Sequence, residues 1–472
     1  MTDEEWLQLK DFPSAAIVAP AGHGKTEILC DIVVKCSGKV LLLTHTNAGI
    51  ESIKKRLSKK NVPSNRYNVE TIASFCIKWC NSYSKTANFN RTLDPFSKNR
   101  DEVTKYYNQT YSGCVLLFSK RWIGDVLKAT YSRVIVDEYQ DCSLKQHEIM
   151  KRISVFLPII VLGDPLQSIF SFSEPVVDWN DLGFPRFDLK TDPWRWKYSN
   201  PELGEYLAEL RKELLALRTS HYEIKSEKFI ELIDPLNFKL RSISQLAKNY
   251  SSVLYLTKWS KKQLNICPRM RGMLQYDEKQ DCFELFDFSK MFDENSGTPL
   301  ALKMIDFLAS CAIGVNKELS SFRNNLSKGK CIFPKIKKHI EIGRYIEKIC
   351  LSKDKNELDL FLFFVAKKLK LKIYRSELFY EMVRSIRLSK EKGVSIEDAS
   401  HLIRKDSRFQ KRYSNFKLLS SRTLLSKGLE FDCVVINLED PFSKNDFYVA
   451  MTRAMKKIYI VSPSRSITFS DK

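Results

Sequence analysis

The chain has 472 residues, of which 43% are hydrophobic and 28% are charged, and this balance excludes an intrinsically disordered protein. Its length suits about two to four domains, and no run approaches the roughly 18 apolar residues that would span a bilayer, so we expect no membrane partner. The formal net charge of +21 favours a polyanionic partner, with nucleic acid as the first expectation.

Four short buried strands are predicted in the first part of the chain, and helical patterns alternate with them. The strands are residues 15–18, 40–43, 134–136 and 159–162, and a helical pattern over residues 26–35 follows the first of them. Short apolar strands that alternate with helices are typical of a parallel sheet covered on both faces. The sequence therefore predicts an α/β fold.

A second group of buried strands is predicted later in the chain, at residues 253–256, 433–437 and 458–461. Because these segments are far apart in sequence, we expect a second α/β sheet that is assembled from distant parts of the chain. Strand signals fade between about residues 297 and 410, where a helical insertion is predicted.

The helical insertion is strongly basic. Residues 321–390 contain 18 Lys and Arg but only 7 Asp and Glu. Clustered cations release counterions from a nucleic-acid backbone, so this segment favours contact with phosphates. The alternative is a solvated helical face whose lysine side chains extend into water.

The 12 cysteines are scattered, mostly within apolar runs. This usage is typical of reduced thiols in a cytosolic core, and the acidic start of the chain lacks the apolar run of a signal peptide. We therefore predict a cytoplasmic location.

A phosphate-binding loop is predicted at residues 19–26, Ala-Pro-Ala-Gly-His-Gly-Lys-Thr, between a buried strand and a helix. Gly22 and Gly24 would let backbone N–H groups approach phosphates, and the helix N-terminus adds positive potential. Lys25 would supply a mobile charge to the β- and γ-phosphates. Thr26 would offer its hydroxyl to Mg²⁺. The alternative is a chance glycine-rich turn.

Two acids, Asp137 and Glu138, follow the third buried strand. Ligands of open α/β sheets bind at the carboxyl ends of strands, so these acids are expected at the same edge as the phosphate loop. Asp137 would hold Mg²⁺, and Glu138 would polarise the attacking water. Without a phosphate loop, such a pair would more often simply end a strand.

These patterns resemble the superfamily 1 helicases of the UvrD, Rep and PcrA type. The resemblance rests on a series of motifs that occur in the family's order, at residues 19–26, 44–48, 71–76, 137–141, 163–170, 193–196, 426–431 and 448–454. It implies two RecA-like parallel-sheet domains, ATP and Mg²⁺ as cofactors, and movement along single-stranded or tailed duplex DNA in the 3′ to 5′ direction.

The resemblance also assigns further residues to nucleotide binding. Gln167 would sense the γ-phosphate, and Trp194 would stack on adenine. Arg195 and Arg453 would come from the second sheet and reach the γ-phosphate. The matching segment at residues 426–431 adds Gly428 and Glu430 as nucleotide-binding residues.

On the DNA side, the resemblance implies contacts from the motifs at residues 44–48, 71–76 and 163–170 and from the residue that lies two positions after the last of these. The residues are Thr46, Asn47, Phe75, Phe170 and Phe172. Stacking of bases on aromatic rings ignores sequence, which suits a motor that moves along any strand. The alternative for Phe170 and Phe172 is core packing.

Several positions depart from the family pattern, and one of them directly follows the predicted phosphate loop. The family often places an arginine directly after the phosphate-loop threonine, where it covers one face of the adenine, but this chain has Glu27 there.

The expected domains follow from the motifs and the helical insertion. Residues 1–75 and 118–188 would form the first RecA-like ATP-binding domain, with a small helical insertion at 76–117. Residues 189–296 and 411–472 would form the second RecA-like domain, with the basic helical insertion at 297–410.

Two functions remain open from the sequence. The first is an ATP-dependent DNA translocase and helicase. The second is a DNA-sensing ATPase subunit that activates a separate nuclease, because compact chains of this kind resemble the helicase-like subunit of the Gabija anti-phage system. A generic P-loop kinase or GTPase would leave the two arginine motifs and the DNA-side aromatic residues unexplained.

Overall fold

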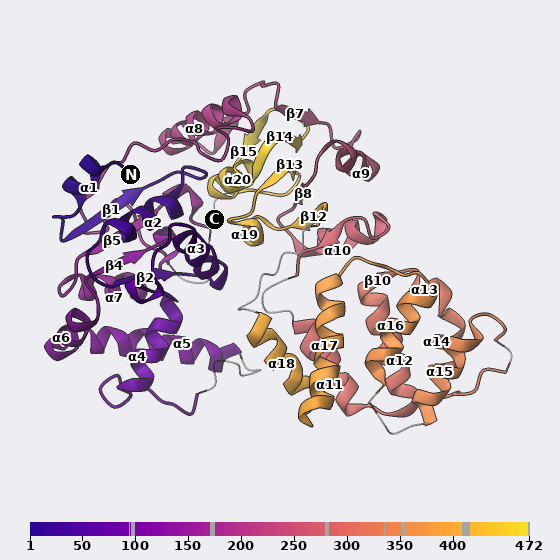
Figure 1. Cartoon of the computed structure of the whole chain (residues 1–472). Helices are drawn as coiled ribbons and strands as arrows, with labels where there is room; N and C mark the ends of the chain where they lie inside the picture. The colour runs from indigo at the N-terminus through magenta and orange to yellow at the C-terminus, as the bar shows by residue number, and fades with distance from the viewer. Residues whose placement is uncertain are drawn as a thin grey trace. The chain divides into compact units, whose positions relative to one another are not determined.

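The computed structural model describes residues 1–93, 95, 100–169, 175–278, 283–334, 336–351, 355, 357–407 and 416–470 (Figure 1). The chain forms two compact units. The first unit comprises Met1–Lys225, Pro441–Lys456 and Ser466–Lys472. The second unit comprises Ser226–Asp440 and Lys457–Arg465.

A five-stranded parallel sheet, in the order β1-β5-β4-β2-β3, forms the centre of the first unit. Its strands are β1 (Ser14–Val18), β2 (Val40–Thr44), β3 (Tyr67–Thr71), β4 (Arg133–Val136) and β5 (Ile159–Gly163). Four of these strands were predicted from their apolar runs, and the structure confirms them. The α/β fold class is likewise confirmed.

Both faces of this sheet are covered, because successive strand residues enter different cores. Leu42 packs in one core with residues of α2 (Lys25–Lys35) and α3 (Asn47–Lys59). Its neighbours Leu41 and Leu43 pack in the other. That second core is built from α4 (Ile72–Ser82), α5 (Arg100–Leu117), α6 (Arg121–Thr130) and α7 (Leu144–Ser154). This alternation is the period-2 pattern of a strand that is buried on both faces.

In the region expected as a small insertion, residues 76–117, the helices α4 and α5 pack directly on the sheet. Cys76 and Cys80 of α4 and Cys114 of α5 are fully buried in the same core as the strand residues. The two helices therefore complete one layer of the first unit. Among the described residues, no group of three metal-binding side chains is arranged to hold a metal ion.

Several further elements belong to the first unit. They are α1 (Asp3–Leu9), η1 (Ser64–Arg66), η2 (Tyr139–Asp141), η3 (Pro165–Gln167), α8 (Pro201–Ala216), β6 (His221–Glu223), α20 (Lys444–Met451) and β15 (Ser466–Thr468). Residues 189–225, 441–456 and 466–472 were expected in the second domain, but they fall in the first compact unit. The physical reason is a set of bonds within the first unit: the Trp196 indole N–H, for example, donates to the carbonyl of Ala454 at 2.7 Å.

The second unit contains a six-stranded sheet in the order β7-β14-β13-β8-β12-β9. The strands are β7 (Ile230–Ile233), β8 (Val253–Leu256), β9 (Gln275–Tyr276), β12 (Leu418–Ser421), β13 (Phe431–Asn437) and β14 (Ala454–Val461), whose first residues belong to the first unit. The helices α9 (Leu240–Asn249), α10 (Ser260–Arg269) and α19 (Thr423–Ser426) accompany them. The predicted strands at 253–256, 433–437 and 458–461 are confirmed.

A helical subdomain with its own core is inserted between β9 and β12 of the second unit (Figure 1). Its helices are α11 (Phe283–Glu294), α12 (Gly297–Cys311), α13 (Val315–Glu318), α14 (Ser320–Leu326), α15 (Ile340–Leu351), α16 (Leu358–Lys368), α17 (Ser376–Lys392) and α18 (Ile396–Ser407), with the short strands β10 (Ala312–Ile313) and β11 (Lys372–Ile373). The predicted helical insertion is confirmed, although its first helix begins at Phe283. In the part of the chain that the structure describes, no helix is long and apolar enough to cross a membrane.

Candidate nucleotide-binding site

The strands of the first sheet end at one level, and this brings the predicted motifs to one edge. The registers pair Val18 with Gly163, Val136 with Val161, and Leu43 with Val136. The segments that follow these strands are the phosphate loop, the acidic pair, the residues after β5 and the start of α3. All four therefore lie at the carboxyl edge, where ligands of open α/β sheets bind.

The phosphate loop has the backbone that its glycines allow. Gly22 and Gly24 adopt φ values of +71° and +78°, which side-chain-bearing residues rarely adopt. Gly24 is the N-cap of α2, and its carbonyl accepts the N–H groups of Glu27 at 2.8 Å and Ile28 at 2.9 Å. The first N–H groups of the helix therefore face the loop and can bind an anion.

Lys25 connects the loop to the acidic pair. Its side chain is 9% exposed, and its Nζ lies 4.0 Å from Oε1 of Glu138. Asp137 is buried at the end of β4. The loop, the lysine and both carboxylates thus converge in one place, as the sequence predicts for a nucleotide site.

Glu138 is held in an unusual conformation. Its φ of +54° lies in the left-handed region, and its backbone N–H donates to Oδ1 of Asp137 at 3.0 Å. The side-chain amide nitrogen of Gln140 donates to Oε2 of Glu138. The amide oxygen of Gln140, Oε1, accepts the backbone N–H of Asp164 at 3.0 Å. A residue other than glycine keeps a left-handed backbone conformation only where the surrounding contacts fix it, and such residues are common at active sites.

The residues predicted to hold Mg²⁺ fit that ion. Asp137 offers a buried carboxylate, and Thr26 is the second residue of α2, beside the anion-binding loop. Carboxylate and hydroxyl oxygens, completed by water and phosphate oxygens, are the ligands that Mg²⁺ prefers.

Gln167 follows β5 in the short helix η3 and is buried. Its Nε2 donates to Oδ2 of Asp164 at 3.0 Å. Asp164 in turn accepts two bonds from Arg211 of α8. Sequence reasoning gave no role to Gln140, Asp164 or Arg211, because their importance depends on contacts between distant parts of the chain.

Trp194 lies beside the phosphate loop with an exposed ring. A Cβ atom added to Gly24 would be 3.4 Å from Cδ1 of Trp194, and the side chain is 51% exposed. The Lys197 ammonium lies 4.1 Å from the ring centroid. Glu27, which replaces the family's arginine, instead forms ion pairs with Lys60 at 2.5 Å and Arg56 at 3.3 Å.

Arg195 and Arg453 both fall in the first compact unit, although Arg453 directly precedes β14 of the second sheet. The Arg195 backbone N–H donates to the carbonyl of Gly22 at 3.1 Å, and its guanidinium donates to the carbonyl of Thr452 at 2.6 Å. Arg453 is 1% exposed, and its Nε donates to the carbonyl of Val449 at 2.9 Å. Gly428 and Glu430, by contrast, lie in the second unit.

The residues predicted on the DNA side have different surroundings. Thr46 is exposed and caps α3 by accepting the N–H of Gly49 at 3.1 Å, and Asn47 is the first residue of that helix. Phe75 is only 2% exposed and stacks on Phe118 with ring centroids 5.8 Å apart. Its predicted contact with DNA is therefore wrong for this side chain, which belongs to the core. Phe170 and Phe172 lie outside the described residues.

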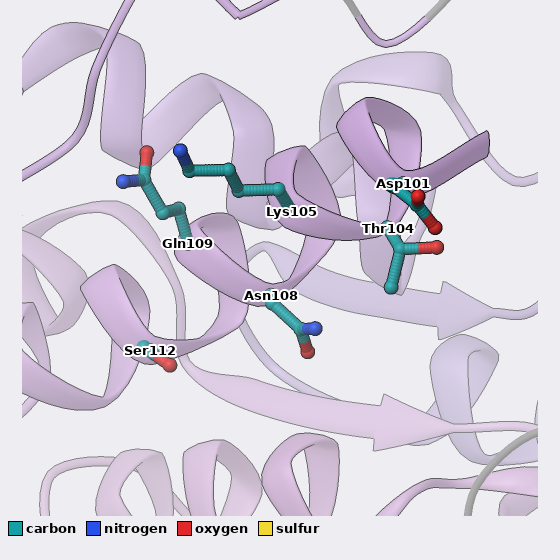
Figure 2. A pocket seen from close by; sticks show the side chains of 6 residues that line it. All are labelled: Asp101, Thr104, Lys105, Asn108, Gln109 and Ser112. Carbon is teal, nitrogen blue, oxygen red and sulfur yellow. The ribbon is translucent and has the colours of Figure 1, made fainter. Parts of the chain in front are cut away.

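A separate shallow cavity of about 420 Å³ lies along one face of α5 (Figure 2). Its lining side chains come from successive turns of this one helix: Asp101, Thr104, Lys105, Asn108, Gln109 and Ser112. None of the predicted site residues contributes to it.

Residues 12–112 and 107–178 match the family described as UvrD/REP helicase N-terminal domain. The match lies within the first unit and includes the phosphate loop, the acidic pair and Gln167. It supports the helicase resemblance but not the more specific resemblance to the Gabija subunit. No curated protein matches the chain by sequence.

Several solved helicase structures are similar to the chain at low identity. The Arterivirus nonstructural protein 10 (helicase) in complex with DNA is 12% identical with a TM-score of 0.37, and the match covers 96% of this chain and 62% of that one. The PRRSV helicase is 10% identical with a TM-score of 0.36, covering 98% and 54%. The Pif1 helicase from Candida albicans is 11% identical with a TM-score of 0.36, covering 100% and 97%. The chain thus spans less than two thirds of the first two helicases.

Proposed function

We propose that the chain is an ATP-dependent DNA translocase and helicase of the UvrD-like type, which couples ATP hydrolysis to movement on single-stranded DNA in the 3′ to 5′ direction. The observation that carries this proposal is the convergence of Lys25 with Asp137 and Glu138 beside a glycine loop that exposes helix N–H groups. Phosphoryl transfer requires this combination of positioned charge, metal ligand and water-activating carboxylate.

Each residue has a distinct role in the proposed hydrolysis. The loop N–H groups and Lys25 would bind the β- and γ-phosphates, and Glu138 would accept a hydrogen bond from the attacking water. Thr26 and Asp137 would hold Mg²⁺, which would neutralise the negative charge of the phosphates. Gln167 would face the γ-phosphate.

The remaining nucleotide contacts are proposed from the family resemblance. Trp194, beside the loop and half exposed, would stack on adenine. Arg195 and Arg453 would stabilise the charge of the transition state. Arg453 would first have to exchange its bond with the Val449 carbonyl for one with phosphate. Gly428 and Glu430 are likewise proposed to bind nucleotide from the resemblance alone.

Nucleic acid is the proposed partner because of charge and placement. Thr46 and Asn47 lie at the carboxyl edge of the first sheet. In the helical subdomain, Lys328, Lys330 and Lys337 are exposed and have no ion pair among the described residues. Cations of this kind favour binding to a phosphate backbone.

The first test is ATP hydrolysis with and without single-stranded DNA. We expect strong stimulation by DNA, and we expect Lys25→Ala to abolish hydrolysis because the phosphates lose their mobile cation. Lys39→Ala, which removes an exposed lysine beyond the same helix, is the matched control. Hydrolysis that persists in Lys25→Ala would contradict the assignment of the site.

Strand displacement on tailed duplexes then separates helicase from sensor. Unwinding of a duplex with a 3′ tail supports the helicase. Hydrolysis that DNA stimulates, without unwinding of any tailed duplex, would instead favour the alternative, a DNA-sensing ATPase subunit that activates a separate nuclease.

A further inference from the structure

One buried carboxylate beside the candidate site has no role in the hydrolysis described above. Asp164, directly after β5, is fully buried. Its Oδ1 accepts bonds from Arg211 through Nε at 3.1 Å and Nη2 at 2.9 Å, and its Oδ2 accepts Nε2 of Gln167 at 3.0 Å. A buried carboxylate stays ionised only where such partners replace water, and Arg211 is the cation among them.

Tyr448 of α20 contacts the phosphate loop. The Ala21 backbone N–H donates to its hydroxyl at 3.3 Å. Because the N–H can only donate, the hydroxyl is the acceptor of this bond. Burial, followed by the negative charge of Asp164, raises the pKa of Tyr448 well above its usual value. The hydroxyl therefore remains protonated.

Asp164 thus connects side chains that come from different elements. It fixes the amide of Gln167 in η3 and is itself held by Arg211 of α8. Arg211 lies 47 residues from Asp164 in sequence, on α8, and is itself largely buried at this ion pair.

We propose that Arg211 is a positioning residue for the proposed ATP hydrolysis. By holding the Asp164 carboxylate in one orientation through two hydrogen bonds, it keeps the amide of Gln167 in its orientation. The inference rests on the proposed function of the site, and it assigns no contact between Arg211 and the nucleotide.

Loss of Arg211 would remove the two hydrogen bonds that fix the Asp164 carboxylate. In Arg211→Met, a buried carboxylate without its cationic partner is costly, so Asp164 would turn towards other donors. Its bond to Nε2 of Gln167 would then no longer be held in one direction. The helix N–H groups and Lys25 would still bind phosphates, so the loss should fall on the hydrolysis step.

Steady-state hydrolysis is measured for Arg211→Met, Arg211→Lys and the control Lys212→Met, which removes the neighbouring exposed cation of α8. We expect Arg211→Met to lower kcat by roughly 10- to 100-fold, the usual effect of losing a residue that orients a site residue, with a much smaller change in KM. Arg211→Lys should recover part of kcat, and Lys212→Met should match the unsubstituted chain. An Arg211→Met variant with unchanged kcat, or equal losses in both methionine variants, would overturn the proposal.

A second measurement is independent of turnover. The dissociation constants of ADP and of a non-hydrolysable ATP analogue are compared for the unsubstituted chain, Arg211→Met and the double variant with Asp164→Asn. We expect the ratio of the ADP dissociation constant to that of the ATP analogue to fall in Arg211→Met. The ratio should recover partly in the double variant, because Asp164→Asn removes the buried negative charge. An unsubstituted chain without ATP hydrolysis would refute the proposed function, whereas an unchanged preference in every variant would refute the positioning role. If Arg211→Met does not fold, Arg211→Lys and the double variant decide the question.

Discussion

At the scale of single residues, Gly22 is constrained in two ways at once. Its φ of +71° is one that side-chain-bearing residues rarely adopt, and an added Cβ would be 2.4 Å from the ring of Trp196. Trp196 cannot retreat easily, because it is fully buried and its indole N–H is bonded to the Ala454 carbonyl. We therefore expect Gly22→Ala to lower the free energy of unfolding by about 2–4 kcal/mol, from left-handed strain and overpacking together.

Urea denaturation of the full chain measures this loss. Gly183→Ala is the matched control in the first unit, because Gly183 has a φ of +67° but an added Cβ would meet nothing closer than 3.9 Å. It should lose only about 1 kcal/mol, the backbone part of the cost. Equal losses in both variants would contradict the clash with Trp196.

The site residues that could be predicted from sequence are those that lie in short continuous motifs. Lys25, Asp137 and Glu138 belong to short segments in which a strand, a loop and a helix follow one another, so sequence alone could bring them to one edge. The role of Arg211 was not predictable, because it depends on a contact with Asp164 that only the fold creates. Phe75 was misassigned because its position on the buried face of α4 depends on how α5 packs over it.

At the scale of elements, one buried ion pair joins the sheet of the second unit to its helical subdomain. Arg375, directly before α17, donates to Glu278 after β9 at 2.6 Å and 2.8 Å, and the two side chains are 3% and 2% exposed. Breaking such a pair leaves a buried charge uncompensated. We expect Arg375→Met to destabilise the second unit by about 3–5 kcal/mol in chemical denaturation at neutral pH.

Arg387→Met is the control for this prediction. Arg387 lies in α17 and pairs with Asp359 at 2.8 Å, and the two side chains are 51% and 9% exposed. Because the arginine of this pair reaches solvent, this variant should lose clearly less stability than Arg375→Met. If both variants lost the same stability, burial of the Arg375 pair would not be the cause.

The same pair predicts how stability depends on pH. Burial raises the pKa of Glu278 above its usual 4.5, although Arg375 acts in the opposite direction. A carboxyl whose pKa is higher in the folded state binds its proton more tightly there, so its contribution to stability is lost as pH rises from the usual value through the folded value. Without Arg375 the pKa should rise further. The loss in the free energy of unfolding caused by Arg375→Met should therefore be smaller in acid and larger towards neutral pH. A loss that does not change with pH would exclude ionisation of Glu278 as its cause.

The strands that sequence reasoning missed explain its limits at this scale. β3 (Tyr67–Thr71) lies at the edge of the first sheet, carries Asn68 and Glu70, and is only half buried. β12 (Leu418–Ser421) is buried along its whole length, but half of it is serine. A search for apolar runs finds central strands and overlooks those whose polar side chains are accommodated by tertiary contacts.

At the scale of the whole molecule, the net charge predicts a salt-dependent affinity for single-stranded DNA. Lys328, Lys330 and Lys337 are exposed and have no ion pair with any described residue. If each contacts a phosphate, replacing all three by glutamine should reduce the slope of log affinity against log salt concentration by about 2. Fluorescence anisotropy with labelled single strands over a range of salt concentrations measures this slope.

The control removes three lysines that are already paired. Lys290, Lys348 and Lys368 form ion pairs with Glu294, Glu357 and Glu341 at 3.6, 2.7 and 2.6 Å. Their replacement should leave the slope nearly unchanged. A triple variant of the unpaired lysines with an unaltered slope would instead support the alternative of a solvated helical face.

The division of the chain into interleaved segments has a consequence for its synthesis. The first unit takes its last segments from Pro441–Lys456 and Ser466–Lys472, long after its central sheet has been translated. A nascent chain that has reached residue 440 already carries the phosphate loop and all five strands, but it lacks Tyr448, which accepts the loop N–H of Ala21, and the Ala454 carbonyl that binds Trp196. A chain whose synthesis stops before residue 441 would thus have an incompletely supported nucleotide site, so that competence for ATP is acquired only after Tyr448 and Ala454 have been added.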